Sequence, residues 1–241
     1  MESTVKINAI IQARMGSTRF PRKVMQPIAG VPMIEFLLSR LSQSKEISKI
    51  ILATSDAPEN EPLSTHVRQL GYCVFEGSEL DVLDRFYNAA MTHPADAVVR
   101  ITGDCPLIDP ALVDATCQLY RTANVDYTSN IRPRTFPDGL DTEVFSMAAL
   151  ARAQQEAKLQ SQREHVTLYI RETGLFTTAG LTHNENLAAE RWTVDAPEDF
   201  TVLRNIVDYF KPRTNFGWLE ILALKKSRPH LFAPNAHLAQ Y

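Results

Sequence analysis

Residues Ile10–Val24 read IIQARMGSTRFPRKV, and this stretch decides the fold. Its first residues belong to an apolar run that predicts a buried strand over Ile7–Ala13. The strand leads into a loop that carries four cations and no acid: Arg14, Arg19, Arg22 and Lys23. Because ligands of open α/β sheets bind beyond the carboxyl ends of the strands, this loop lies where an anionic ligand would be held.

The composition of this loop favours a triphosphate ligand over a solvated basic turn. A triphosphate needs cationic donors and exposed backbone N–H groups. Gly16 allows close backbone approach, and Ser17 and Thr18 add hydroxyl donors. Charge runs are usually solvated turns, but here the cations cluster in a chain whose net charge is −3. The loop is neither a Walker P-loop nor a dinucleotide fingerprint, because it has one glycine and lacks the Gly-Lys-Ser/Thr ending.

Beyond the loop, short β-rich runs alternate with amphipathic helical runs. Strands are expected at Lys49–Thr54, Cys73–Glu76 and Ala97–Ile101, and helices at Met33–Leu41, Pro62–Leu70, Asp81–Met91 and Asp109–Tyr120. Such alternation predicts right-handed crossovers and a largely parallel sheet that helices cover on both faces.

The regular alternation ends after Asn124. A proline-rich loop (residues 131–139, IRPRTFPDG) comes first, and Leu140–Phe145 is expected to return to the sheet. Later helices are expected at Ala148–Lys158, Glu164–Glu172 and Pro197–Phe210, and strands at Leu175–Gly180 and Arg191–Val194. We therefore predict a single domain over residues 1–225 with an excursion at about 130–185. Residues 226–241 have little periodicity and are expected to form a C-terminal surface extension.

The bulk composition is that of an ordinary globular protein. The 241 residues are 44% hydrophobic and 22% charged, and the net charge of −3 gives no basic field for nucleic acid. The three cysteines, at 73, 105 and 117, fit neither a disulfide framework nor a zinc signature. Met1–Lys6 does not resemble a signal peptide, and no apolar run is long enough to span a bilayer. The expectation is a cytoplasmic protein with no nucleic-acid partner and no membrane insertion.

Two aspartates follow predicted strands. Asp104 comes after Thr102-Gly103, and Asp195 comes after Val194 in the string VDAP. Carboxylates on the same rim of a sheet can hold a hard cation such as Mg²⁺, which keeps phosphates and waters as its remaining ligands. The alternative is that each caps the helix that follows it, and for Asp195 this alternative has equal weight.

The ordered motifs resemble the sugar-acid cytidylyltransferases. Ala13-Arg14, Ser17, Arg19, Pro21 and Lys23 resemble the signature of the 3-deoxy-manno-octulosonate and acylneuraminate enzymes. The string QARMGSTRFPRK is most similar to the branch of spore coat polysaccharide biosynthesis proteins. Further matching strings are KVMQPIAGVP, GSELDVLDRF, RITGDCPLIDP, GLDTEVF, REHVT and VDAPEDF. The resemblance spans about residues 7–210.

The resemblance implies a fold and a reaction. The fold would be a three-layer α/β/α Rossmann-like mixed sheet of the nucleotide-diphospho-sugar transferase type. The reaction would move CMP from CTP to an acidic sugar or a related small acid and release pyrophosphate. Arg19 and Lys23 would act as catalytic cations on the phosphates, and Asp104 and Asp195 would hold Mg²⁺.

Other residues are expected around the two substrates. The nucleotide would contact Gln12, Ala13, Arg14, Gly16, Ser17, Arg100 and Asp104. The segments that hold Asp141, Glu143, Arg163 and His165 resemble acceptor-side segments, and a salt-bridge cluster is an equally weighted alternative. Arg100 lies within a predicted strand, where a buried cation needs a partner.

A homodimer is also expected. The excursion mixes arginines with the apolar residues Phe136, Leu140, Leu168, Tyr169 and Ile170, which is an interface-like composition. Relatives that have this first loop are commonly dimers.

The sequence departs from the family pattern at one position, and it fits two rival functions less well. The octulosonate enzymes have an acid beside the first aspartate, where this chain has Cys105, so the octulosonate substrate does not carry over. A metal-dependent glycosyltransferase would normally have an Asp-x-Asp pair, and this chain has Asp104-Cys105-Pro106 instead. A silent nucleotide-binding subunit of a polysaccharide-assembly complex would not need to keep both carboxylates and the cationic loop.

Overall fold

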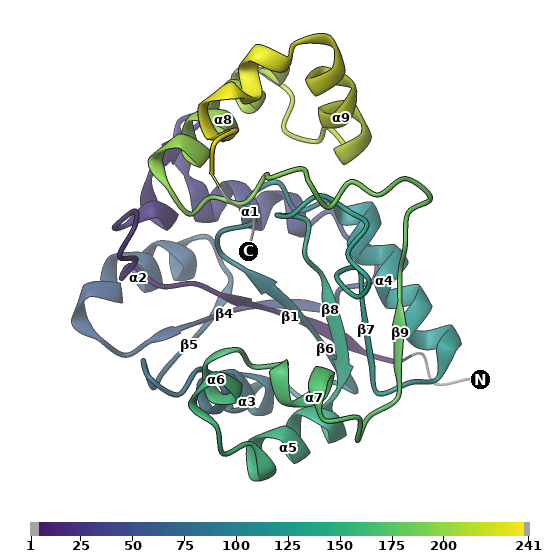
Figure 1. Ribbon diagram of the computed structural model, residues 1–241. Coiled ribbons are helices and arrows are strands. Elements are labelled where there is room, and N and C mark those ends of the chain that lie inside the picture. Colours follow the sequence, from purple (N-terminus) through teal and green to yellow (C-terminus); the bar gives the residue numbers. More distant parts are fainter. Residues whose placement is uncertain (1–4, 239–241) are drawn as a thin grey trace.

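The protein forms one seven-stranded mixed sheet and a small two-stranded one, in a computed structural model that describes residues 5–238. Strand order in the large sheet is β5-β4-β1-β6-β8-β7-β9 (Figure 1). Its strands are β1 (Ile7–Gln12), β4 (Lys49–Ser55), β5 (Cys73–Gly77), β6 (Ala97–Thr102), β7 (Tyr127–Ser129), β8 (Glu143–Ser146) and β9 (Thr178–Gly180). Strand β8 runs antiparallel to β6 and β7, whereas the other neighbours are parallel. The small sheet is the hairpin β2 (Pro27–Ile28) and β3 (Val31–Pro32).

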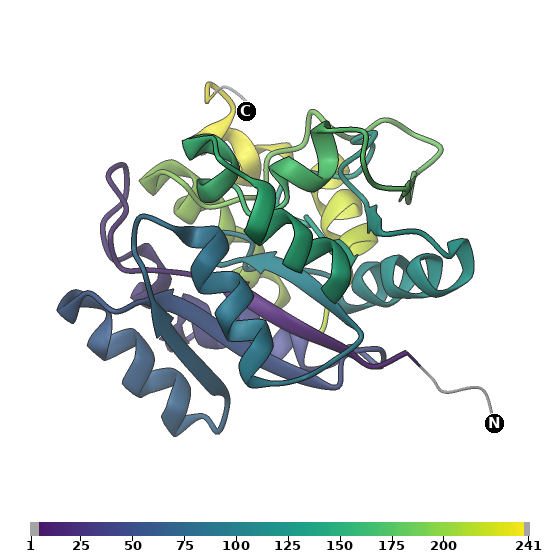
Figure 2. The ribbon, with the colours of Figure 1, turned by 90° about the horizontal axis from the view of Figure 1, so that it is seen from below.

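Helices cover both faces of the large sheet, as the sequence predicted (Figures 1 and 2). One face carries α1 (Met33–Leu41), α2 (Glu61–Gln69), α4 (Pro110–Ala123), α8 (Pro197–Phe210) and α9 (Trp218–Ser227). The other carries α3 (Val82–Thr92), α5 (Met147–Glu156), α6 (Gln160–Glu164) and α7 (Leu168–Glu172). The alternation of β1 explains the two cores, since Ala9 and Ile11 pack into the first and Ile10 into the second. None of the described helices is long and apolar enough to cross a membrane.

The excursion departs from the sequence prediction in two places. The helix expected over Glu164–Glu172 is broken at Val166, whose φ of 31° interrupts the helical backbone between α6 and α7. The strand expected over Arg191–Val194 is wrong. Within residues 5–238 this segment makes a single bridge, between Asp138 and Arg191, instead of joining the sheet.

Gly139 explains why the two segments lie so close. Its φ is +109°, a value that favours glycine, and a Cβ there would come within 2.5 Å of the Thr193 nitrogen. The extended backbone near 191–194 therefore packs flat against the 138–139 turn, and the apolar side chains Trp192 and Val194 that suggested a strand are buried in the core.

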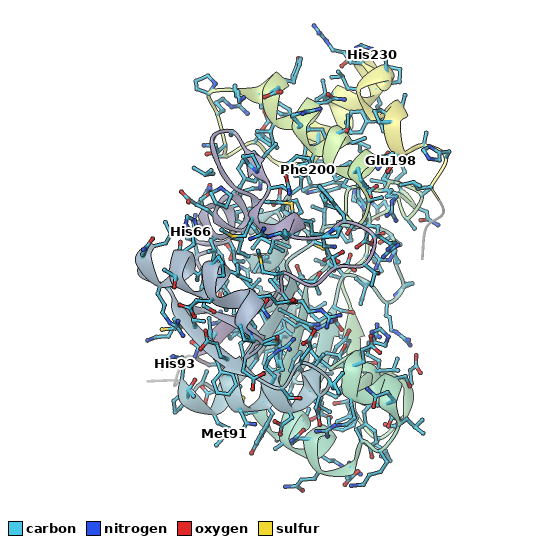
Figure 3. The ribbon with its side chains drawn as sticks, turned by 90° about the vertical axis from the view of Figure 1, so that its left-hand side faces the viewer. His66, Met91, His93, Glu198, Phe200 and His230 are labelled. Carbon is cyan, nitrogen blue, oxygen red and sulfur yellow. The ribbon has the colours of Figure 1, made fainter. Side chains whose placement is uncertain are left out.

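The segment after α9 is more integrated than the expected surface extension. Pro229–Asn235 forms a 3₁₀ helix, η3, in which Phe232 and Asn235 are buried. It packs against α8, and the Asn205 side chain donates to the Leu231 carbonyl at 2.8 Å. Figure 3 shows His230 of η3 at the end of the molecule opposite to Met91 and His93. A 3₁₀ helix with proline lacks the 3.6-residue periodicity on which the prediction relied. Residues 1–4 and 239–241, which belong to the predicted terminal segments, lie outside the described residues.

Candidate active site

A cavity of about 350 Å³ opens at the carboxyl ends of β1 and β6. All of the predicted nucleotide-binding and catalytic residues line it. Its lining includes Gln12, Ala13, Arg14, Gly16, Ser17, Arg19, Lys23, Arg100, Asp104 and His165, together with Thr18, Val24, Val82, Arg85, Thr102, Gly103 and Glu164. The floor is therefore formed by strand ends, and one wall is the cationic loop.

Gly103 allows the two strand ends to lie against each other. Its amide donates to the Gln12 carbonyl at 2.8 Å. A Cβ on Gly103 would lie 2.6 Å from the Cβ of Ala13, which is closer than real side chains approach. The glycine therefore brings Asp104 next to the beginning of the loop after β1.

Lys23 is the centre of the charged cluster. It begins the 3₁₀ helix η1 (Lys23–Met25), and its side chain is 11% exposed. The Nζ atom donates to Asp195 Oδ1 at 2.8 Å and to the Val194 carbonyl at 2.7 Å. It also lies 3.7 Å from Asp104 Oδ2. One ammonium group thus joins both aspartates that the sequence predicted as a pair.

Arg19 reaches the same pair from the loop. Its Nη2 lies 3.2 Å from Asp195 Oδ2, the oxygen that Lys23 does not contact. Arg14 forms an exposed ion pair with Glu79 at 3.2 Å. The loop cations expected to meet phosphates are therefore paired with carboxylates in the protein alone.

The two aspartates are held together by the backbone as well. The Val194 amide donates to the Asp104 carbonyl at 2.8 Å, and the Thr193 hydroxyl donates to it at 3.2 Å. Neither aspartate caps the helix that follows it: the N-cap of α8 is Ala196, and the N-cap of α4 is Asp109. This geometry argues against the helix-cap alternative.

The oxygen atoms present fit a magnesium ion. Asp104 and Asp195 both lie within 4 Å of one nitrogen atom, so their carboxylates converge on a common point. Across residues 5–238, no group of three or more His, Cys, Asp or Glu side chains is arranged as a metal site. Two carboxylates with phosphate and water oxygens is the ligand set that Mg²⁺ commonly uses at nucleotides. Cys105 is buried among core residues, and burial raises the pKa of its thiol.

Arg100 has the buried partner that its position required. Its Nη1 donates to Glu143 Oε1 at 2.5 Å across the β6–β8 pair, and its Nη2 donates to Gln12 Oε1 at 3.2 Å. Tyr127 and Thr167 donate to the other Glu143 oxygen at 2.7 and 2.6 Å. Burial would raise the pKa of Glu143, but Arg100 and these hydroxyls outweigh it and lower the pKa.

Glu143 was predicted as an acceptor contact, and the structure places it outside the lining of the cavity. Its carboxylate is buried and committed to protein donors. Its effect on the cavity is indirect, because it fixes the guanidinium of Arg100, which does line the cavity.

Arg163 was also predicted on the acceptor side, and it too is committed elsewhere. Its guanidinium donates to both oxygens of Asp81, the closest contact being 2.6 Å, and to the Gln154 carbonyl at 2.8 Å. Asp81 is the N-cap of α3. The arginine therefore fixes α6 against α3, and this leaves Glu164 and His165 on the cavity wall.

Asp141 lies in a second, smaller cavity of about 130 Å³ that adjoins the first at Asp104. The small cavity is lined by Thr102, Asp104, Cys105, Asp138, Asp141, Thr193 and Asp195. Arg134 binds Asp141 with two hydrogen bonds of 2.7 Å and lies 3.4 Å from Asp138. Burial, and then the charge of Asp141, raise the pKa of Asp138 to about 6.

Arg85 contributes to the cavity more than its sequence context indicated. It lies on α3, its side chain is buried, and it donates to the Ser78 carbonyl at 2.8 Å. Burial, and then the nearby charge of Arg14, lower its pKa to about 10. Among the described residues, no hydrogen-bond partner is found for its Nε. The sequence did not predict this contribution of Arg85, because an arginine in the helical string DVLDRF is equally compatible with a surface ion pair.

A buried network behind Asp195 had no signal in the sequence. Arg191 binds Asp199 through two hydrogen bonds of 2.9 and 2.7 Å, and Asn235 donates to Asp199 at 2.9 Å. Burial would raise the pKa of Asp199, but these donors lower it. The partners are far apart in sequence, so only the fold brings them together.

Comparisons with known proteins agree with this geometry. A family model described as cytidylyltransferase matches residues 8–214. The spore coat polysaccharide biosynthesis protein SpsF of Bacillus subtilis is 33% identical over 91% of this chain and 94% of its own. A 3-deoxy-manno-octulosonate cytidylyltransferase of Geobacter metallireducens is 38% identical over 46% of this chain and 42% of its own. The solved structure of a cytidylyltransferase from Leptospira borgpetersenii superposes with a TM-score of 0.90 at 30% identity, covering 98% of this chain and 99% of that one.

Proposed function

This chain belongs to the cytidylyltransferase family, and from that premise we propose that it transfers CMP from CTP to an acidic sugar or a related small acid. Pyrophosphate is the second product. The acceptor class is supported by the similarity to SpsF and to the octulosonate enzyme, and the product would serve polysaccharide or glycoconjugate biosynthesis. Family membership disfavours the glycosyltransferase and the silent-subunit alternatives.

One observation carries the proposal. Lys23 Nζ lies 2.8 Å from Asp195 and 3.7 Å from Asp104, at the junction between the cationic loop and the strand ends. A cluster of alternating charges of this kind can receive a metal–triphosphate complex as a unit, because each charge in the cluster finds an opposite charge in the ligand.

The residues have distinct tasks in this reaction. Gln12, Ala13, Arg14, Gly16, Ser17 and Arg100 would bind the nucleotide. Arg19 and Lys23 would neutralise the phosphates, and Asp104 and Asp195 would hold Mg²⁺, which adds charge neutralisation when bound. The acceptor hydroxyl attacks the α-phosphorus in line, and pyrophosphate leaves on the opposite side. Such a transfer depends mainly on positioning and charge stabilisation.

His165 and Asp141 remain the proposed acceptor contacts. His165 lies on the cavity wall beside Glu164, and Asp141 lies in the adjoining acidic cavity. Arg134, which binds Asp141, adds a cation beside that cavity that an acidic acceptor could meet.

The test is pyrophosphate release with each nucleoside triphosphate, Mg²⁺ and a panel of acidic acceptors. CTP should be preferred, because a pocket that hydrogen-bonds the base edge rejects the other bases. Equal rates with all four nucleotides would count against the proposal, as would full activity in EDTA. Asp104→Asn and Asp195→Asn should each remove most activity, and the double variant should be little worse than either, as expected of residues that act together.

A further inference from the structure

We propose that Asp199 and Asn235 are positioning residues that fix Asp195 for metal binding, so that the C-terminal 3₁₀ helix completes the site. This inference rests on the proposed function, in which Asp195 is a metal ligand. It concerns residues that do not line the main cavity and that come from α8 and η3.

Asp199 holds the turn that presents Asp195. Its Oδ2 accepts hydrogen bonds from the amides of Asp195 and Ala196, both at 3.0 Å. Asp199 is in the first turn of α8, where a carboxylate that reaches back to the preceding amides also stabilises the helix start. Because the amide of Asp195 is fixed, the direction in which its side chain leaves the backbone is fixed as well.

Arg191 couples the two carboxylates. Its Nη2 donates to Asp199 Oδ2 at 2.7 Å and lies 3.8 Å from Asp195 Oδ2. Its Nε donates to Asp199 Oδ1 at 2.9 Å. The Arg191 side chain is 5% exposed and the Asp199 side chain is fully buried, so the pair is shielded from water. The guanidinium thus attracts Asp195 from behind while Lys23 and Arg19 attract it from the cavity side.

Asn235 of η3 donates hydrogen bonds to both Arg191 and Asp199. Its Nδ2 donates to Asp199 Oδ1 at 2.9 Å and to the Arg191 carbonyl at 3.2 Å. Asn235 is buried. One amide therefore bridges the backbone of residue 191 and the carboxylate that holds residue 195.

The tail also has an anchor that is unrelated to this network, which permits a matched comparison. The Asn205 side chain donates to the Leu231 carbonyl at 2.8 Å. Asn205→Ala and Asn235→Ala each remove asparagine amide bonds that attach η3, but only Asn235 contacts Asp199. Loss of stability alone should therefore affect the two variants alike, whereas loss of positioning should affect only Asn235→Ala.

The decisive measurement is the affinity of the protein for Mn²⁺ with saturating CTP and no acceptor. Water-proton relaxation reports the bound Mn²⁺. Asn235→Ala should weaken Mn²⁺ binding by about tenfold, the lower range for residues that orient a metal ligand. Asn205→Ala should leave it within about twofold of the unsubstituted protein, although both variants lose melting temperature. Asn235→Leu keeps a similar side-chain volume, has no donor and adds no charge beside Asp199, so it should weaken binding as well and serves if the alanine variant does not fold.

Two results would overturn the inference in distinguishable ways. Equal Mn²⁺ affinity in Asn235→Ala, Asn235→Leu and Asn205→Ala, with weak binding in Asp195→Asn, would refute the role of Asn235 alone. Unchanged Mn²⁺ affinity in Asp195→Asn would remove the metal assignment itself and the inference with it.

Discussion

At the scale of single residues, Lys23 of the cationic loop has two kinds of partner, carboxylates in the protein alone and phosphate in the proposed reaction. In the protein alone, the Lys23 ammonium neutralises Asp195 and lies close to Asp104. In the proposed reaction it must bind phosphate, while the carboxylates must bind a cation. We therefore expect the triphosphate and the metal to bind cooperatively, because each would release the charged group that the other binds.

We predict that Lys23→Met has opposite effects on turnover and on metal binding. Turnover should fall by about 100-fold or more, because a preorganised cation at the phosphates is lost. Mn²⁺ binding without nucleotide should become tighter, because the two carboxylates lose their resident cation. Electron paramagnetic resonance of free Mn²⁺ measures the second effect, and Arg22→Met, a charge change at the neighbouring position, is the control. Weaker Mn²⁺ binding in Lys23→Met would show that the lysine does not compete with the ion.

The raised pKa of Asp138 predicts that the stability difference between the unsubstituted protein and Asp138→Asn depends on pH. Its pKa is about 6 in the folded protein against an ordinary 3.8, so the folded state favours the protonated form. Its contribution to stability is present below about pH 4 and is lost as the pH rises through 6. Asp138→Asn should therefore gain stability relative to the unsubstituted protein between pH 4 and 7, by at most about 3 kcal/mol. Urea unfolding at both pH values measures the difference, and a constant difference would contradict the prediction.

At the scale of elements, the β6–β8 pair places Arg100 beside the cavity while its ion-pair partner, Glu143, stays buried. Arg100 and Glu143 are direct neighbours in the antiparallel register, and their side chains are 13% and 3% exposed. Breaking a buried pair from one side leaves a charge without compensation, which is costly.

Glu143→Gln should therefore lower the free energy of unfolding by about 3–5 kcal/mol. The double variant Glu143→Gln/Arg100→Met should recover much of this loss, because no isolated charge then remains in the sheet. Denaturant unfolding of Glu143→Gln, Arg100→Met and the double variant measures the coupling. If the free energy of unfolding falls in the double variant by the sum of the decreases in the two single variants, the ion pair does not determine the loss of stability.

The sequence predicted the elements whose signal is local and missed those that depend on distant contacts. The strand over 7–13 and the helix over 33–41 have clear apolar patterns, and both are present as β1 and α1. Strand β7 and helix α9 were not predicted, because a three-residue strand and an almost uniformly apolar helix start have weak periodicity. Likewise, the cationic loop and Asp104 were readable from sequence, whereas the Asp199–Asn235 contact joins residues that only the fold makes neighbours.

At the scale of the whole molecule, the composition of residues 130–185 no longer supports the expected dimer. Of the five apolar residues that predict an interface, Phe136, Leu140, Tyr169 and Ile170 are buried in the cores of a single chain, and Leu168 is half-buried. Leu159 and Leu175 are the exposed large apolar residues that the excursion displays, at 61% and 49% exposed.

The homodimer nonetheless remains our prediction. Light scattering at micromolar concentration should give about twice the chain mass of 27.1 kDa. Leu159→Glu should shift the mass toward the monomer if the excursion forms the interface, and Leu219→Glu, an equally exposed leucine of α9, is the control. A monomeric mass in the unsubstituted protein would refute the prediction.

The late position of Asn235 in the chain has a consequence for biosynthesis. Domains emerge from the ribosome N-terminal end first, so the sheet and the cationic loop can form while the last segment is still being translated. Asn235 can donate to Asp199 and to the Arg191 carbonyl only when residue 235 has been released. A nascent chain that stalls or terminates between α9 and this residue would thus resemble the finished protein in its sheet and its nucleotide loop, yet would lack the last restraint on Asp195.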